Sequence, residues 1–159
     1  MSKTACLPAP GEKAPEISLP DGNGKTVTLS ALRGKPVVVY FYPKDDTPGC
    51  TVEAKGFEAL GAGFARAGAE VLGVSPDSPA SHCKFQKKYG LGFTLLSDER
   101  HEAAEAYGVW VEKSMYGKTY MGIQRATFLV DAAGNIARVW PKVKPEGHAD
   151  EVLEAVRGL

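Results

Sequence analysis

The chain has 159 residues, 43% of them hydrophobic, so it is long enough to bury a substantial core. Lysine plus arginine and aspartate plus glutamate number 19 each, so the formal net charge is zero, which gives no electrostatic case for binding nucleic acid or an anionic membrane. Three cysteines, an odd number, do not form a secreted disulfide framework. Functional thiols in a reducing compartment fit better, and we expect a cytoplasmic protein.

We expect no targeting segment in the N-terminal stretch. Residues 1–10 contain no apolar run of the signal-peptide type, and no run in the chain approaches the length of a transmembrane helix. Residues 1–14 are rich in Pro, Gly and Lys, and we expect a loose arm at the start of a single domain that comprises residues 1–159. Cys6 lies in this arm, where a thiol without a role is the more common case.

The first predicted elements are a hairpin and a buried strand. The turn residues Asp-Gly-Asn-Gly at 21–24 separate two strand-like stretches, 17–19 and 26–29. Residues 30–35 predict a short helical turn. The continuous apolar run at 37–42 then predicts a strand buried on both faces.

This strand leads into the stretch Pro43 to Cys50, from which a helix is predicted to run to about residue 67. Pro48 suits the first helical position and Thr47 the N-cap, so Cys50 falls in the first turn. There it meets unpaired backbone N–H groups and the positive end of the helix dipole, which favour thiolate over thiol. The stretch therefore predicts a reactive sulfur, with a small buried hydrophobe as the alternative.

Three glycines, Gly56, Gly61 and Gly63, interrupt this predicted helix. Each interior glycine costs about 1 kcal/mol relative to alanine. Either the helix packs closely against its neighbours, or its first turns are able to come apart. The sequence leaves both interpretations open.

The remainder alternates strands with helices and predicts an α/β sandwich. Strands are expected at 70–75, 93–96, 126–130 and 136–140, helices from about 77 to 89, 98 to 107 and 147 to 156, and an irregular insertion at 109–121. On the helix capped by Ser78 or Asp77, His82 and Phe85 share one face. Cys83 should therefore lie on the polar, solvent side of that helix.

Other groups predict little additional chemistry. His82, His101 and His148 have no ligand spacing to the cysteines, so we expect no zinc site. Asp45 and Asp46 are interpreted as part of a solvated loop rather than a cation site. There is no glycine-rich phosphate loop or dinucleotide fingerprint. The absence of a Cys-x-x-Cys pair argues against thiol–disulfide exchange as the main activity.

The motif Pro-x-x-x-Thr-x-x-Cys, met by Pro43, Thr47 and Cys50, resembles the active site of the peroxiredoxins. The resemblance runs from about Gly11 to the C-terminus and favours the bacterioferritin comigratory protein, or peroxiredoxin Q, subgroup. It also includes Phe41-Tyr42-Pro43, Thr47-Pro48-Gly49-Cys50-Thr51-x-Glu53, Ser81-His82-x-Lys84-Phe85 and Arg125-x-Thr127-Phe128. It implies a thioredoxin-like fold, a central mixed sheet flanked by helices, with an N-terminal β-hairpin extension and no metal or organic cofactor.

The same resemblance implies a thiol peroxidase for hydrogen peroxide and organic hydroperoxides, in which the Cys50 thiolate becomes a sulfenic acid. Arg125 matches the arginine that faces the catalytic cysteine, where a permanent cation would hold the thiolate and orient a peroxide oxygen. The alternative for Arg125 is a surface charge at a strand end. Thr47 would cap the helix and contact thiolate or peroxide, and Pro43 would shield the thiolate from water.

Many members of the subgroup place a resolving cysteine five residues after the catalytic one, where this chain has Lys55. Other members place it on the following helix, and Cys83 matches that arrangement. The resemblance thus implies a Cys50–Cys83 disulfide, recycled by thioredoxin or a similar reductant, in a protein that we expect to be monomeric. A one-cysteine cycle, resolution by Cys6, and a thioredoxin-fold thiol oxidoreductase or binding protein remain alternatives.

Overall fold

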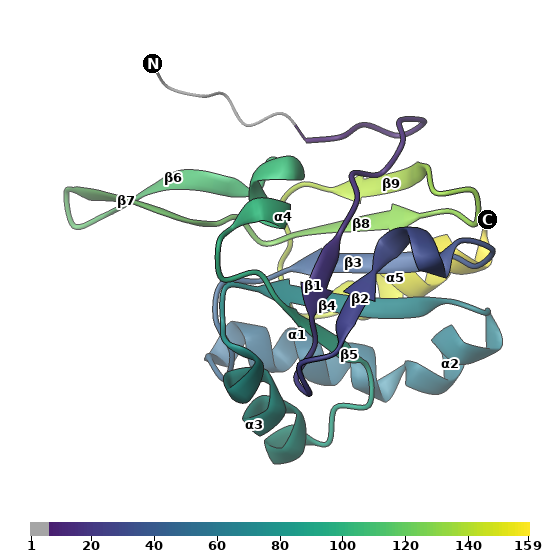
Figure 1. The fold of residues 1–159 in the computed structure, drawn as a ribbon, viewed down its shortest axis with the longest axis horizontal. Helices are drawn as coiled ribbons and strands as arrows, with labels where there is room; N and C mark the ends of the chain where they lie inside the picture. Colours follow the sequence, from purple (N-terminus) through teal and green to yellow (C-terminus); the bar gives the residue numbers. More distant parts are fainter. Residues whose placement is uncertain (1–6) are drawn as a thin grey trace.

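Residues 7–159 are described in the computed structural model of the chain, which is built on a five-stranded sheet with the order β5-β4-β3-β8-β9 (Figure 1). The strands are β3 (Val37–Phe41), β4 (Glu70–Ser75), β5 (Thr94–Ser97), β8 (Ala126–Val130) and β9 (Ile136–Trp140). Strand β3 pairs in parallel with β4 and antiparallel with β8. The expected central mixed sheet is therefore confirmed.

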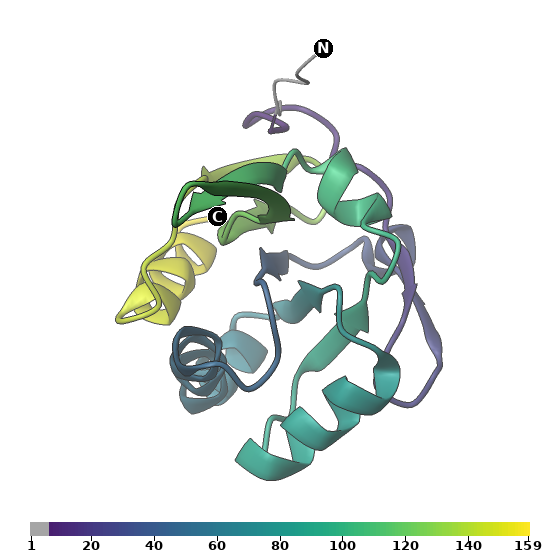
Figure 2. The same cartoon turned by 90° about the vertical axis from the view of Figure 1, so that its left-hand side faces the viewer.

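Helices cover both faces of this sheet (Figure 2). Residues of α1 (Pro48–Ala59), α2 (Gly61–Arg66), α3 (Pro79–Tyr89) and α5 (His148–Arg157) share one hydrophobic cluster, whereas α4 (Glu102–Ala106) contributes to the other. Successive side chains of a strand point to opposite faces, so Val37, Val39 and Phe41 enter one cluster and Val38 and Tyr40 the other. This double burial explains the continuous apolar run of β3.

The predicted N-terminal hairpin is present as β1 (Ser18–Pro20) and β2 (Thr26–Thr28), followed by the 3-10 turn η1 (Leu29–Leu32). Asp21, in its turn, forms an isolated bridge with Leu96 of the edge strand β5. The hairpin therefore covers part of an edge that would otherwise expose unpaired backbone groups.

The segment expected to be a loose arm is partly fixed. Cys6 lies outside the described residues, so the structure does not test its role. The backbone N–H of Gly11 donates to Ile136 O at 2.8 Å, and the N–H of Ile136 donates to Glu12 O at 2.7 Å. Ala14 is buried. These contacts hold the end of the arm along the start of β9, so the expectation of a loose segment is wrong there.

The expected irregular insertion at 109–121 is instead a hairpin of β6 (Trp110–Met115) and β7 (Lys118–Ile123) that projects from the body of the protein (Figure 1). Its two-residue turn, Tyr116-Gly117, has φ values of 52° and 76°. Positive φ at both central residues is the geometry of a type I′ hairpin turn, which suits the twist of the flanking strands.

The helix predicted from 48 to 67 is divided at Leu60 into α1 and α2. Close packing explains Gly63, since a Cβ there would lie only 2.9 Å from Leu153 Cδ2, whereas a Cβ at Gly56 would meet Ala149 Cβ at 3.5 Å, an ordinary van der Waals distance. Gly61 has open space around it and begins α2. Among the residues described, no helix combines the length and the apolar character needed to span a membrane.

Candidate active site

Cys50 lies in the first turn of α1, directly after the loop that leaves β3. The backbone of Thr47 is extended and Pro48 occupies the first helical turn, as the sequence predicts. The Thr47 side chain does not cap the helix, because its Oγ1 donates to the backbone oxygen of Lys44 at 2.9 Å. The expected side-chain cap is therefore absent, and the free N–H groups of the first turn remain beside the sulfur. Cys50 itself is 1% exposed.

Arg125, just before β8, brings its guanidinium to this sulfur. Its Nη2 lies 3.4 Å from Cys50 Sγ. Gly49 permits the approach, since a Cβ at that position would lie 3.1 Å from the same nitrogen, tighter than an ordinary van der Waals contact. The structure thus places together the cysteine and the arginine that the sequence singles out.

Glu53 completes the cluster, and the sequence analysis assigned it no role. Its Oε1 accepts from Arg125 Nη1 at 2.6 Å, so the guanidinium binds the carboxyl group through one nitrogen and the Cys50 sulfur through the other. The side chain of Glu53 is fully buried. Cys50 and Glu53 are three residues apart on one helix, a spacing that places both on the same face and could have indicated the contact.

Burial and charge act in opposite directions on this pair. Burial raises the pKa of Glu53 to about 7, although the adjacent Arg125 opposes the shift. Burial also lowers the pKa of Arg125, but the charges of Glu53 and Cys50 outweigh this effect and leave the Arg125 pKa raised. The guanidinium therefore stays charged beside the sulfur, while the Glu53 carboxyl is sensitive to pH near neutrality.

Cys83 lies on a different element, α3, and is half-buried rather than on a fully solvated side. The turn of the N-terminal hairpin lies over it: a Cβ on Gly22 would be 3.3 Å from Cys83 N and 3.5 Å from its Cα. This cover could not be read from the periodicity of the helix alone. Cys50 and Cys83 are both free thiols, and the hydrogen-bond partner of the Cys50 sulfur is Arg125.

The loop between β3 and α1 is only in part the solvated segment that the sequence suggests, since Asp46 is exposed as expected but Asp45 is not. Pro43 is half-buried, and Asp45 is only 7% exposed. The Asp45 carboxylate accepts from Tyr42 OH at 2.6 Å and Ser81 Oγ at 2.8 Å, and lies 2.7 Å from His82 Nδ1. The expectation for Asp45 is therefore wrong, because partners on α3 replace water.

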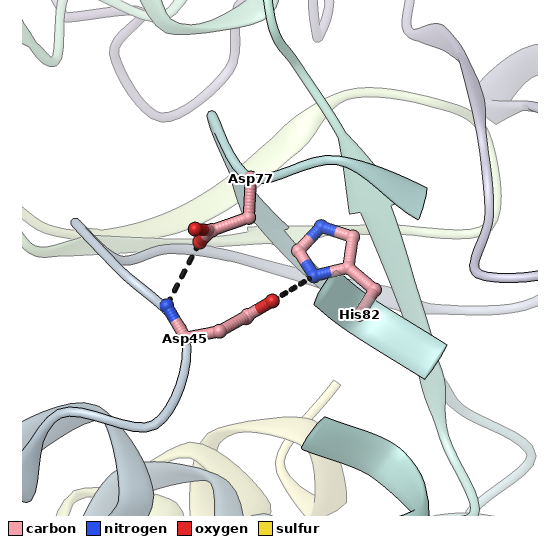
Figure 3. Close-up of side chains that lie close together, drawn as sticks. All are labelled: Asp45, Asp77 and His82. Atoms are coloured by element: carbon pink, nitrogen blue, oxygen red, sulfur yellow. Dashed lines mark hydrogen bonds and ion pairs between the residues drawn. The ribbon is translucent and has the colours of Figure 1, made fainter. Parts of the chain in front are cut away.

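Asp45, Asp77 and His82 present oxygen and nitrogen atoms within 4.8 Å of one another (Figure 3), a grouping that resembles a metal site. These atoms already serve other bonds, however. Asp77 Oδ2 accepts from Asp45 N at 2.8 Å and Ser75 Oγ at 2.6 Å, and His82 Nε2 lies 2.9 Å from Leu96 O. The grouping is therefore a hydrogen-bonded network whose oxygens are occupied by protein donors.

Comparison with known proteins places this geometry in a family. The sequence matches the AhpC/TSA family over residues 10–139. It is 48% identical to peroxiredoxin Bcp of Bacillus subtilis strain 168 over 149 residues, which cover 94% of this chain and 95% of the relative. It is 50% identical to peroxiredoxin Bcp of Escherichia coli strain K12 over 143 residues, which cover 90% and 92%.

A solved structure shows the same fold. Bacterioferritin comigratory protein of Xanthomonas campestris, studied for its alkyl peroxide reduction activity, superposes with a TM-score of 0.87 at 45% identity, covering 97% of this chain and 98% of that one. Family, sequence relatives and solved fold agree with the motif around Cys50. The chain therefore belongs to the AhpC/TSA family, among the peroxiredoxins of the Bcp and Q type.

Proposed function

We propose that this protein is a thiol-dependent peroxidase in which Cys50 attacks the substrate. The observation that carries the proposal is the 3.4 Å contact between Cys50 Sγ and Arg125 Nη2 at the start of α1. A guanidinium and free backbone N–H groups favour the thiolate, which is the nucleophilic form of cysteine. The relatives named peroxiredoxin Bcp and the alkyl peroxide reduction of the Xanthomonas protein support hydroperoxides as the substrates.

In the first step the Cys50 thiolate attacks one oxygen of the hydroperoxide, and the O–O bond breaks. Sulfur becomes a sulfenic acid, and the other oxygen leaves with a proton as water or an alcohol. Arg125 stabilises negative charge on the leaving oxygen, because its guanidinium lies beside the sulfur at which the peroxide reacts. The Thr47 hydroxyl, whose proton goes to Lys44 O, can accept a hydrogen bond from the substrate at the helix start, and Pro43 limits access of water.

In the second step the Cys83 thiol condenses with the sulfenic acid, which forms a Cys50–Cys83 disulfide and releases water. An external dithiol of the thioredoxin type then reduces this disulfide by exchange and returns both thiols. We propose that the protein carries out this cycle as a monomer. The half-buried position of Cys83 supports the assignment, because a thiol that is only partly covered is available for exchange.

The test is mass spectrometry of the reduced protein after one equivalent of hydrogen peroxide. We expect a single new peptide linkage between Cys50 and Cys83, and a trapped sulfenic acid on Cys50 when Cys83 is replaced by serine. A sulfenic acid that persists in the wild type would indicate a one-cysteine cycle. A linkage to Cys6 would assign resolution to the N-terminal segment. Reduction of insulin-type disulfides without consumption of peroxide would favour a thiol oxidoreductase instead.

A further inference from the structure

The loop between β3 and α1 is fastened to α3 by two charged contacts of different character, and Ser81 Oγ of α3 also donates to Asp45 Oδ2 at 2.8 Å. One is buried: Asp45 Oδ2 and His82 Nδ1 lie 2.7 Å apart, with side chains 4% and 0% exposed (Figure 3). The other is at the surface, where Asp46 accepts from Lys88 Nζ at 2.7 Å and from Tyr89 OH at 2.6 Å. The loop that leads to the peroxidatic cysteine is thus tied to the helix that carries the second cysteine.

The hydrogen bonds of His82 define its charge. Nδ1 faces the Asp45 carboxylate, and Nε2 lies 2.9 Å from the backbone oxygen of Leu96. Tyr42 OH is also 3.5 Å from Nδ1, but it donates its own proton to Asp45 Oδ1 at 2.6 Å. Both ring nitrogens face acceptors, and only an imidazolium has an N–H on each nitrogen. Asp45 and His82 therefore form a buried ion pair.

The two charged contacts differ in how strongly they stabilise the attachment of the loop to α3. Removal of one partner from a buried ion pair leaves an uncompensated charge without water, which is strongly unfavourable. The Lys88–Asp46 pair is exposed, with side chains 58% and 40% accessible, and pairs of this kind contribute little. The buried pair is therefore the contact on which the attachment of the loop to α3 depends.

The backbone of the loop needs this attachment. Asp46, between the buried pair and Thr47, has φ of 58°, in the left-handed region that non-glycine residues rarely adopt. Such a conformation persists where surrounding contacts hold it, and here both flanking contacts come from α3. If α3 moves away, the loop loses the contacts that maintain the strained residue.

We propose that His82 is a positioning residue: through Asp45 it holds the loop between β3 and α1 against α3. Rupture of this ion pair limits the rate of the opening that lets Cys83 reach Cys50. The inference rests on the proposed function. While the pair is intact, the Cys83 thiol does not reach the Cys50 sulfenic acid, and the acid persists. Once the pair breaks, the acid condenses with the Cys83 thiol and releases water. Before that, a second hydroperoxide oxidises the acid to sulfinic acid and leaves as water or alcohol. The pair thus sets the partition between disulfide and over-oxidation.

The test compares His82→Gln, which keeps a hydrogen-bonding side chain but removes the charge, with the matched control Lys88→Gln, which removes the exposed pair between the same two segments. Each reduced protein is mixed with excess hydrogen peroxide, quenched at intervals and analysed by mass spectrometry. We expect His82→Gln to form sulfenic acid more slowly but disulfide faster, with at least a threefold lower sulfinic fraction. Lys88→Gln should match the wild type. Equal effects of the two substitutions, or none for His82→Gln, would overturn the proposal.

Two further measurements do not depend on the disulfide. Nuclear magnetic resonance of reduced wild-type protein should show protons on both ring nitrogens of His82; a proton on only one would refute the ion pair. Hydrogen exchange in a Cys83→Ser background should be faster at residues 43–47 and 79–89 for His82→Gln than for Lys88→Gln. If His82→Gln fails to fold, Asp45→Asn takes its place in every measurement.

Failure of this inference is distinguishable from failure of the proposed function. Absence of a Cys50–Cys83 disulfide in the oxidised wild type would refute the function proposed for Cys83, whatever the variants do. Unchanged hydrogen exchange in His82→Gln, with that disulfide confirmed in the wild type, would refute the role of His82 alone.

Discussion

Cys50 and Cys83 occupy environments of opposite kinds. Cys50 is in the first turn of its helix, 1% exposed, and its sulfur lies 3.4 Å from a guanidinium nitrogen. Cys83 is in the middle of α3, where backbone N–H groups are used within the helix, and it is half-buried beneath the turn that contains Gly22. The first environment places a cation at hydrogen-bond distance from a sulfur, whereas the second only covers a thiol.

For the proposed cycle, this difference means that the reduced protein is arranged for the first half. The groups around Cys50 are in place before peroxide arrives, so the first step needs little reorganisation. A disulfide needs Cα atoms within about 7 Å and suitably directed side chains, and Cys83 lies under a hairpin turn on a separate helix. The second step therefore requires movement, and the comparison can be tested by disabling each half separately.

The largest effect should come from the two cysteines. Cys50→Ser should reduce peroxide consumption to the uncatalysed background, because no other described thiol has an activating partner. Cys83→Ser should keep the first oxidation at the wild-type rate but stop turnover with the thioredoxin-type reductant. Stopped-flow oxidation and steady-state peroxide assays separate these outcomes. Substantial turnover of Cys50→Ser would remove the distinction between the two thiols.

Removal of the guanidinium should have the next largest effect. Arg125→Ala should lower the second-order rate of peroxide reduction about 10²- to 10³-fold, the usual cost of losing one preorganised donor at a charge-developing site. Arg125→Lys should restore part of the rate, since lysine keeps the charge but lacks the planar fork. A rate within twofold of wild type in the alanine variant would mean that the arginine is structural.

Glu53→Gln should have a smaller effect, roughly tenfold on the same rate, because it weakens a charge-assisted hydrogen bond worth about 1.5 kcal/mol.

The folded protein holds the Glu53 proton up to about pH 7, whereas the unfolded chain releases it near the ordinary glutamate value. Its contribution to stability is thus present at low pH and lost as pH rises through about 7. Denaturant titrations from pH 5 to 8 should show this fall in the free energy of unfolding with rising pH in the wild type and not in Glu53→Gln.

Oxidation should change the structure near the two cysteines more than it changes the sheet. We expect the disulfide form to lose helical circular dichroism and to exchange amide hydrogens faster near residues 50–60 and 80–88. The break between α1 and α2, where Gly61 has open space, supports unwinding of α1. Identical protection in both redox forms, with the disulfide confirmed, would show that the two sulfurs already lie within reach.

The smallest expected effect concerns His148, on the α5 side of the sheet. Burial lowers its pKa, and its Nε2 is 2.8 Å from Thr127 Oγ1. As pH falls, His148 binds a proton in the unfolded chain before it does so in the folded protein. Its contribution to the free energy of unfolding is therefore present above the ordinary histidine pKa and is lost as pH falls below it. Between pH 7.5 and 5.5 the wild-type Tm should fall about 2–4 °C more than that of His148→Asn. An equal fall would show that other groups control acid stability.

The sequence predicted what depends on local patterns. The apolar run of β3 and the Pro43–Cys50 motif indicated the central strand and the helix start correctly. The pairing of Arg125 with Cys50 was expected only through the family resemblance, and two other pairings across the fold were not predicted: Arg125 and Glu53 are 72 positions apart, and Asp45 and His82 are 37 apart. Periodicity reports which face of an element is apolar, but not which polar groups it meets.

The β6–β7 hairpin was missed for a different reason. Most of its side chains are exposed, so it lacks the alternation of buried and exposed residues by which half-buried strands are recognised. Its turn, Tyr116-Gly117, is also not one of the dipeptides that signal a hairpin most strongly. Chain geometry at the turn and pairing between the two strands, rather than burial, maintain this element.

That projecting hairpin has a practical use. Its tip residue, Tyr116, is 96% exposed, and the loop tip is a position at which proteins commonly tolerate insertions. The strands of the hairpin pair with each other, and β7 ends at Ile123, two residues before Arg125. A fluorophore or affinity tag placed at Tyr116 would therefore occupy the exposed tip of a ribbon whose strands pair with each other. The hairpin offers a handle for following the enzyme at work without modifying either thiol.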